Sequence, residues 1–88
     1  MKLLKDGFVL RHVADTWVVM PLGQMSLDFN GMLTLNETGA LLWKTLEQGG
    51  DAEALVSALT AEYDVSAEIA RADVEAFLEK LKNAGCME

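Results

Sequence analysis

Few residues of this chain have side chains that commonly perform catalysis. His12 is the only histidine and Cys86 the only cysteine among 88 residues. Histidine is the most frequent general acid or base, but His12 follows Arg11 in a stretch typical of a strand, which favours an ordinary surface position. Cys86 lies close to the C-terminal end, where the environment that activates a thiolate is hard to build. We therefore expect Cys86 to be a tail thiol without a role.

Metal and phosphate chemistry have no better support. One histidine and one cysteine cannot supply the nitrogen and sulfur ligands of a structural zinc site. The 14 acidic residues are spread over predicted helix surfaces and indicate a solvated face. The pairs Asn30-Gly31 and Gly49-Gly50 match no phosphate-binding glycine pattern. The sequence therefore predicts a protein that is not an enzyme and that needs no metal ion or cofactor.

Length and charge limit the class of protein further. A chain of 88 residues predicts one domain, 1–88, and 51% hydrophobic residues is typical of a globular protein. The net charge of −7 argues against nucleic acid as a partner, because phosphate backbones are bound by Lys and Arg, and it also argues against anionic membranes. No segment approaches the roughly 20 apolar residues of a membrane span, and the N-terminus lacks the features of a signal peptide. We expect a cytoplasmic protein, which the lone cysteine fits.

The first third of the chain predicts a β-hairpin. Residues 8–13 and 16–22 are rich in β-branched and aromatic residues, and Ala14-Asp15 between them is short enough for a tight turn. Pro21 cannot donate to a β-ladder and is expected to end the second strand.

A third strand is predicted directly before the first helix. The two-residue period of a half-buried strand runs through Met32, Leu33, Thr34 and Leu35. Residues 27–29 could extend it, with Asn30-Gly31 as a turn or a bulge.

Three helices follow, each preceded by a residue suited to cap it. The predicted ranges are 37–48, 51–63 and 66–83. A capping side chain accepts from an otherwise unpaired N–H group of the first turn, and the predicted caps are Asn36, Asp51 and Ser66. Glycines after the first and third helices suit the left-handed conformation that ends many helices. The apolar stripes recur at three- and four-residue spacing and include Trp43, Leu55, Val56, Leu59, Tyr63, Ile69, Ala70, Val74, Phe77, Leu78 and Leu81.

The order of three strands and three helices indicates an α+β fold with a three-stranded antiparallel sheet and helices on one face. An uncovered sheet edge offers unpaired N–H and C=O groups to another extended chain. The third strand could therefore bind a peptide by β-augmentation. The simpler alternative is that Leu33 and Leu35 are only core residues and that a loop covers the edge.

Two opposite charges on the third helix could belong to the same site. Asp73 and Lys80 are seven residues apart and bracket Phe77, so they lie near one face of the helix. They could line the rim of a groove and bind charges on a peptide, or they could be ordinary boundary residues.

Several of these segments together resemble the PqqD-like family. They are LDFNGMLTLNETGALLW, a helix ending in EYDV, and ARADVEAFLEKLKNAG, and the resemblance covers about residues 8–85. It implies a winged-helix-like fold and a non-catalytic peptide chaperone, or recognition element for ribosomally synthesised and modified peptides. Such a protein binds the leader of a precursor peptide beside its third strand and presents it to a modifying enzyme, frequently a radical S-adenosylmethionine (radical SAM) protein.

The resemblance also implies where the peptide binds. Its strand would lie between the third strand and the third helix. The implied peptide-binding residues are Met32, Leu33, Thr34, Leu35, Asp73, Phe77, Lys80 and Leu81.

Two other functions and one assembly remain open. An acyl or peptidyl carrier would fit the acidic charge and the length, but none of Ser26, Ser57 and Ser66 follows an aspartate as a carrier serine normally does. A winged-helix DNA-binding domain would fit the order of elements, but the charge opposes it. The helical second half, with Met87 near its end, could also serve a homodimer.

Overall fold

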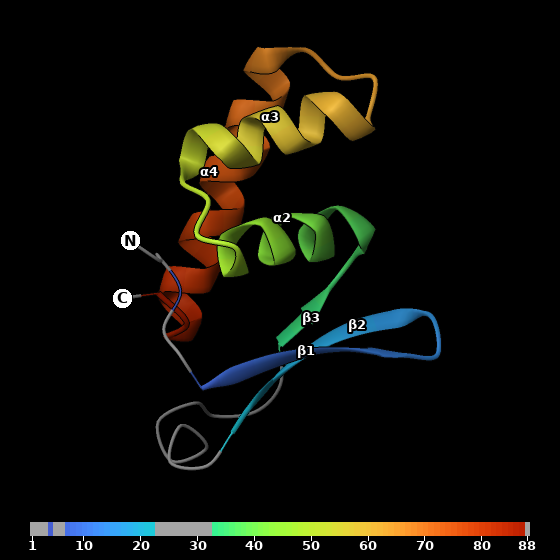
Figure 1. Ribbon diagram of the computed structural model, residues 1–88, viewed down its shortest axis with the longest axis vertical. Coiled ribbons are helices and arrows are strands. Elements are labelled where there is room, and N and C mark those ends of the chain that lie inside the picture. The colour runs from blue at the N-terminus through green and yellow to red at the C-terminus, as the bar shows by residue number, and fades with distance from the viewer. Residues whose placement is uncertain (1–3, 5–6, 23–32, 88) are drawn as a thin grey trace.

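Three strands lead into three helices (Figure 1). The computed structural model describes residues 4, 7–22 and 33–87. The strands are β1 (Phe8–Val13), β2 (Thr16–Pro21) and β3 (Leu33–Leu35), and the helices are α2 (Glu37–Glu47), α3 (Ala52–Glu62) and α4 (Ala67–Ala84). The predicted α+β fold is confirmed, including the end of the second strand at Pro21.

The sheet is antiparallel with the order β1-β2-β3. β1 and β2 form the predicted hairpin, in which Val13 pairs with Thr16 across the two-residue turn. Ala14 adopts a φ of 56°, in the left-handed region that such tight turns require. β3 pairs only with β2 among the described strands, so it lies at an edge of the sheet.

The predicted start of the third strand falls outside the described residues. Met32, the extension at 27–29 and the turn or bulge at Asn30-Gly31 are not among the residues that the structure describes.

The three predicted helix caps are confirmed. The side chain of Asn36 accepts from the backbone N–H of Gly39 at 2.8 Å. Asp51 caps α3 and Ser66 caps α4 in the same way, at 3.0 Å and 3.2 Å. At the other end of α4, Gly85 has a φ of 83°, as expected of a left-handed cap. The Asn36 cap fixes where β3 turns into α2, which decides the shape of the site.

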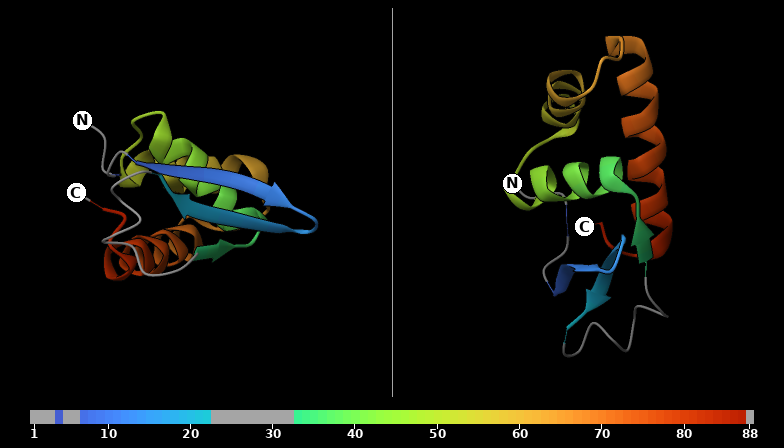
Figure 2. Two further views of the ribbon diagram at one scale, coloured as in Figure 1. Left: turned by 90° about the horizontal axis from the view of Figure 1, so that it is seen from below. Right: turned by 90° about the vertical axis from the view of Figure 1, so that its right-hand side faces the viewer.

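The helices lie on one side of the sheet (Figure 2). α2 crosses above the strands, α3 lies beyond α2, and α4 runs alongside both and reaches β3. The core between these elements includes Val19 from the sheet and the predicted core residue Trp43, which is 1% exposed. Its fully buried side chains also include Leu42, Leu46, Leu55, Leu59, Val74, Leu81 and Cys86.

Three sequence predictions about burial were wrong. Tyr63 is 39% exposed because it is the C-cap of α3 and its extended backbone leaves the helical stripe. Ile69 is 55% exposed because it lies about 100° around α4 from Ala70, the neighbour that packs inward. Cys86 is buried in the hydrophobic core, so the thiol has a packing role after all.

Candidate functional site

In the edge strand β3, the leucine side chains pack into the core while one edge of the main chain faces outward. Leu33 and Leu35 lie opposite Val19 and Trp17 of β2, and both leucines pack against the core cluster. Thr34 points to the other face of the sheet and is exposed. The leucine side chains are therefore core, as the simpler alternative held, while the outer main-chain edge of β3 faces α4 (Figure 2).

A lysine of α4 identifies which backbone groups of β3 face outward. The Nζ of Lys80 donates to the carbonyl oxygen of Thr34 at 3.2 Å. α4 lies on the side of β3 away from β2, so this carbonyl is directed to the open edge. In an antiparallel ladder the N–H and C=O of one residue point to the same side. Thr34 thus presents both a donor and an acceptor at the edge.

A hollow of about 340 Å³ lies next to this edge, between β3, α2 and α4. Its apolar part comes from Leu35, Leu42, Ala76 and Phe77, and polar groups surround these. The complete lining is Leu35, Asn36, Thr38, Gly39, Leu42, Asp73, Ala76, Phe77 and Lys80. We call this space the β3–α4 hollow.

The structure brings most of the predicted peptide-binding residues together. Leu35, Asp73, Phe77 and Lys80 line the β3–α4 hollow. Leu33 and Thr34 are the other two residues of β3. Leu81 is fully buried in the core, so its side chain supports α4 without reaching the hollow. Met32 lies outside the described residues.

The sequence prediction missed the first turn of α2. Asn36, Thr38 and Gly39 line the hollow because the cap at Asn36 turns the chain sharply at the end of β3. The capping pattern was visible in the sequence, but it gives the start of a helix and not the neighbour that the first turn faces.

Gly39 makes close packing around the hollow possible. A Cβ atom at this position would lie 3.2 Å from the Cβ of Leu35 and 3.4 Å from Cε1 of Phe77. The first of these distances is tighter than ordinary van der Waals contact. A glycine therefore lets β3, α2 and the ring of Phe77 meet at the floor of the hollow.

A second hollow, of about 190 Å³, lies on the other side of the start of α2. Trp17, Leu41, Lys44, Glu62 and Tyr63 line it together with Glu37 and Ala40. The exposed ring of His12 stacks on Trp17, with the ring centres 4.2 Å apart, and the Nζ of Lys44 lies 4.3 Å from the centre of the Trp17 ring. We call this space the Trp17 hollow.

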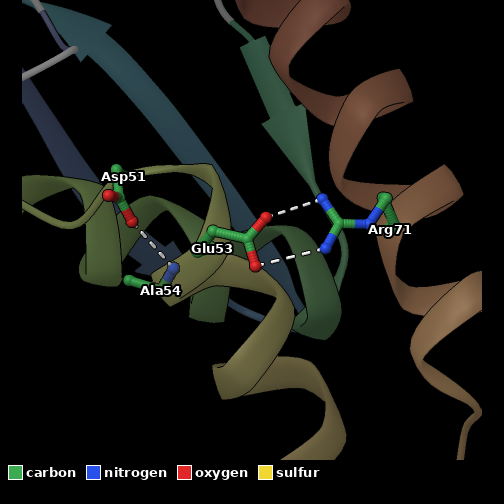
Figure 3. Close-up of polar contacts among 4 residues, drawn as sticks. All are labelled: Asp51, Glu53, Ala54 and Arg71. Atoms are coloured by element: carbon green, nitrogen blue, oxygen red, sulfur yellow. Dashed lines mark hydrogen bonds and ion pairs between the residues drawn. The ribbon is translucent and has the colours of Figure 1, made fainter.

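One ion pair joins α3 to α4 away from both hollows (Figure 3). Arg71 donates two hydrogen bonds to the carboxylate of Glu53, at 2.7 Å and 3.2 Å. These bonds lower the pKa of Glu53 and raise the pKa of Arg71. Both side chains are exposed, and neither lines a hollow. The pair therefore ties two helices together and has no place in a site.

Within the described residues, no group of three or more His, Cys, Asp or Glu side chains could hold a metal ion. In the same part of the chain, no helix is long and apolar enough to cross a membrane.

Comparison with known proteins identifies the class of this small α+β domain with a hollow at its sheet edge. Residues 16–87 match the family model described as coenzyme PQQ synthesis protein D (PqqD). The chain belongs to the PqqD family, as the resemblance predicted.

Two solved structures have the same fold. One is described as TbiB1 in complex with the TbiA(beta) leader peptide; it is 32% identical with a TM-score of 0.80, over 100% of this chain and 95% of that chain. The other is described as lasso peptide synthetase B1 complexed with the leader peptide; it is 25% identical with a TM-score of 0.77, over 97% and 94% of the two chains. No curated protein matches the sequence. None of these comparisons supports a carrier protein or a DNA-binding domain.

Proposed function

We propose that this protein is a non-catalytic recognition element that binds the leader of a ribosomally synthesised precursor peptide. The leader adds as a strand to the outer edge of β3 and lies over the β3–α4 hollow. The observation that carries this proposal is the outward C=O of Thr34, which accepts from Lys80 beside an open hollow. The two similar structures, each described as a complex with a leader peptide, support the same ligand class.

The geometry explains how such a peptide would be held. The backbone N–H of Thr34 donates to the peptide main chain, and the Thr34 C=O accepts from it. Every second side chain of the peptide points toward the helices, where Leu35, Leu42 and Phe77 offer apolar contact. Main-chain pairing supplies affinity without regard to sequence, and the shape and charge of the β3–α4 hollow supply selectivity.

The protein presents the precursor peptide, and a partner enzyme catalyses the modification. Among the described residues, the lining of the β3–α4 hollow contains one aspartate and one lysine but no histidine or cysteine, so these residues offer a poor set of groups for proton transfer or nucleophilic attack. A bound leader fixes the position of the rest of the precursor, which raises its effective concentration at an enzyme that binds this protein.

The receiving enzyme is a peptide-modifying enzyme. A radical SAM protein is one candidate, which the family resemblance implies. An enzyme of lasso peptide synthesis is the second, and the description of one similar structure as a lasso peptide synthetase component favours it. Pull-down of each candidate enzyme from the same genome, with and without the precursor, distinguishes the two.

The direct test is titration of isotope-labelled protein with the leader of a precursor peptide encoded beside its gene. We expect the largest amide shifts at β3 and along α4 from Asp73 to Leu81. Shifts confined to the Trp17 hollow would place the peptide elsewhere. The absence of shifts at high excess of every neighbouring candidate would contradict the proposal.

A further inference from the structure

The side of α4 that faces the β3–α4 hollow carries a positive charge without an acidic partner. Side chains three or four residues apart on a helix are neighbours. At these spacings from Lys80 no residue is acidic; the four are Ala76, Phe77, Asn83 and Ala84. Lys80 also forms no ion pair with any described residue. This is notable in a chain with 14 acidic residues and only seven basic ones.

Asp73, which also lines the hollow, likewise has no oppositely charged neighbour on its helix. The residues three and four positions away from it are Ile69, Ala70, Ala76 and Phe77, and none is basic. Among the described residues it forms no ion pair either. The hollow therefore has one unpaired charge of each sign along its rim.

The other side of α4 shows the contrast. Arg71 pairs with Glu53 of α3 at 2.7 Å, and Lys82 has Glu79 three residues before it. Arg71 thus has an ion-pair partner and Lys82 has an acidic neighbour on the same helix, while among the described residues Lys80 and Asp73 have neither.

The single polar contact of Lys80 lies where a ligand strand must bind. Its ammonium donates to the Thr34 carbonyl, which is the acceptor that an incoming strand would use for its own N–H. A lysine at a sheet edge also discourages indiscriminate pairing with other chains. Lys80 therefore competes with any strand that adds to β3, and a strand that offers the ammonium a carboxylate compensates for the lost contact.

We infer, on the basis of the proposed function, that the β3–α4 hollow selects an extended peptide that carries a carboxylate. When the peptide pairs with β3, the ammonium of Lys80 leaves the Thr34 carbonyl and binds this carboxylate. A basic residue opposite Asp73 then fixes the direction of the peptide. Seven residues of helix separate the two charges by about 10 Å. At about 3.3 Å per strand residue, complementary charges on one face of the peptide lie two or four residues apart.

The test is a selection from a phage-displayed library of random 20-residue peptides against four proteins: wild type, Lys80→Met, Lys80→Glu and Lys82→Met. Lys82 is exposed on the same helix and does not line the hollow, so its variant is the matched control. We expect wild type and Lys82→Met to enrich Asp or Glu at one peptide position. Lys80→Met should lose that enrichment, and Lys80→Glu should enrich Lys or Arg at the same position.

Affinities of one selected peptide and its Glu→Gln or Asp→Asn counterpart quantify the effect. We expect the substitution to weaken binding to wild type by about five-fold and to Lys80→Met by less than two-fold, the scale of an ion pair at a partly solvated rim. Circular dichroism confirms that each variant is folded.

The outcomes separate the inference from the proposed function. Selected peptides without acidic enrichment, or with the same enrichment for Lys80→Met, overturn the inference and leave strand addition in place. Failure of folded wild type to select any peptide, together with no binding of the encoded leader, overturns the proposed function and the inference with it.

Discussion

The two hollows on either side of the start of α2 differ in which groups the protein leaves without a partner. In the Trp17 hollow, His12 covers one side of the indole ring and Lys44 lies over the ring, and among the described residues the group left unpaired is the buried indole N–H of Trp17. In the β3–α4 hollow, the edge of β3 and the charges of Asp73 and Lys80 have few partners. The larger hollow is the one beside an open strand edge, so its volume and its unpaired backbone groups indicate the same site, whereas the unpaired group of the Trp17 hollow is a single buried donor.

The largest expected effect comes from truncating the side chain that separates the hollow from the core. Phe77→Ala should lower the free energy of unfolding by about 3 kcal/mol, because Phe77 is only 8% exposed and its removal leaves a cavity. Tyr63→Ala, at the rim of the Trp17 hollow, should cost less than about 1 kcal/mol. Urea unfolding measures both. Equal losses of unfolding free energy in the two variants would contradict the expected difference between the hollows.

A proline at the edge of β3 should come next in size. Thr34→Pro removes the outward N–H and should weaken leader binding at least about ten-fold, a loss of about 1.4 kcal/mol. The fold should persist, because this N–H does not face β2. Thr34→Ala keeps the N–H and is the matched control. Retained affinity in a folded proline variant would show that the ligand does not pair with β3.

A smaller effect is expected in the Trp17 hollow. Lys44→Met removes the cation over the indole ring and should lower stability by about 0.5 kcal/mol. Leader affinity should stay unchanged, since Lys44 does not line the β3–α4 hollow. Thermal unfolding and calorimetric titration give the two numbers. A loss of affinity without a loss of stability would reverse the roles of the two hollows.

The smallest effect concerns the Glu53–Arg71 pair, which serves as a reference outside both hollows. The folded state lowers the pKa of Glu53, because Arg71 donates hydrogen bonds to the carboxylate. Its stabilising contribution is therefore present above the ordinary value of 4.5 and is lost as the pH falls through the lower, folded value. Wild type should exceed Glu53→Gln slightly in unfolding midpoint at pH 7, and the difference should vanish as the pH falls below the folded pKa of Glu53. A difference that grows on acidification would contradict this assignment.

The sequence predicted the elements of this fold well because their ends depend on local chemistry. The caps at Asn36, Asp51 and Ser66 and the short Ala14-Asp15 turn are signals within a few residues. Burial was predicted less well where it depends on tertiary position. Ile69 fits the helical period but lies on the outer side of α4, and Cys86 is buried although it lies close to the end of the chain.

The candidate site was predicted only in part, because some of its residues are brought together by tertiary packing that local patterns do not encode. The contribution of β3 and α4 came from the family resemblance together with the spacing of Asp73 and Lys80. The contribution of Thr38 and Gly39 depends on how α2 lies against α4, and no local pattern encodes that arrangement. The contact of Lys80 with Thr34 spans 46 positions of sequence, which periodicity cannot reveal.

The burial of Cys86 belongs to a wider feature, the β-bridge between Leu4 and Met87. The bridge and the buried side chains of Leu4 and Cys86 hold the first and last parts of the described chain together. Joining residue 88 to residue 1 with a short flexible linker and opening the chain at Ala14-Asp15 should therefore yield a circular permutant with the same sheet and helices. In such a permutant β1 follows α4 along the chain, so the sheet with the proposed peptide-binding edge at β3 would form although β1 is synthesised last.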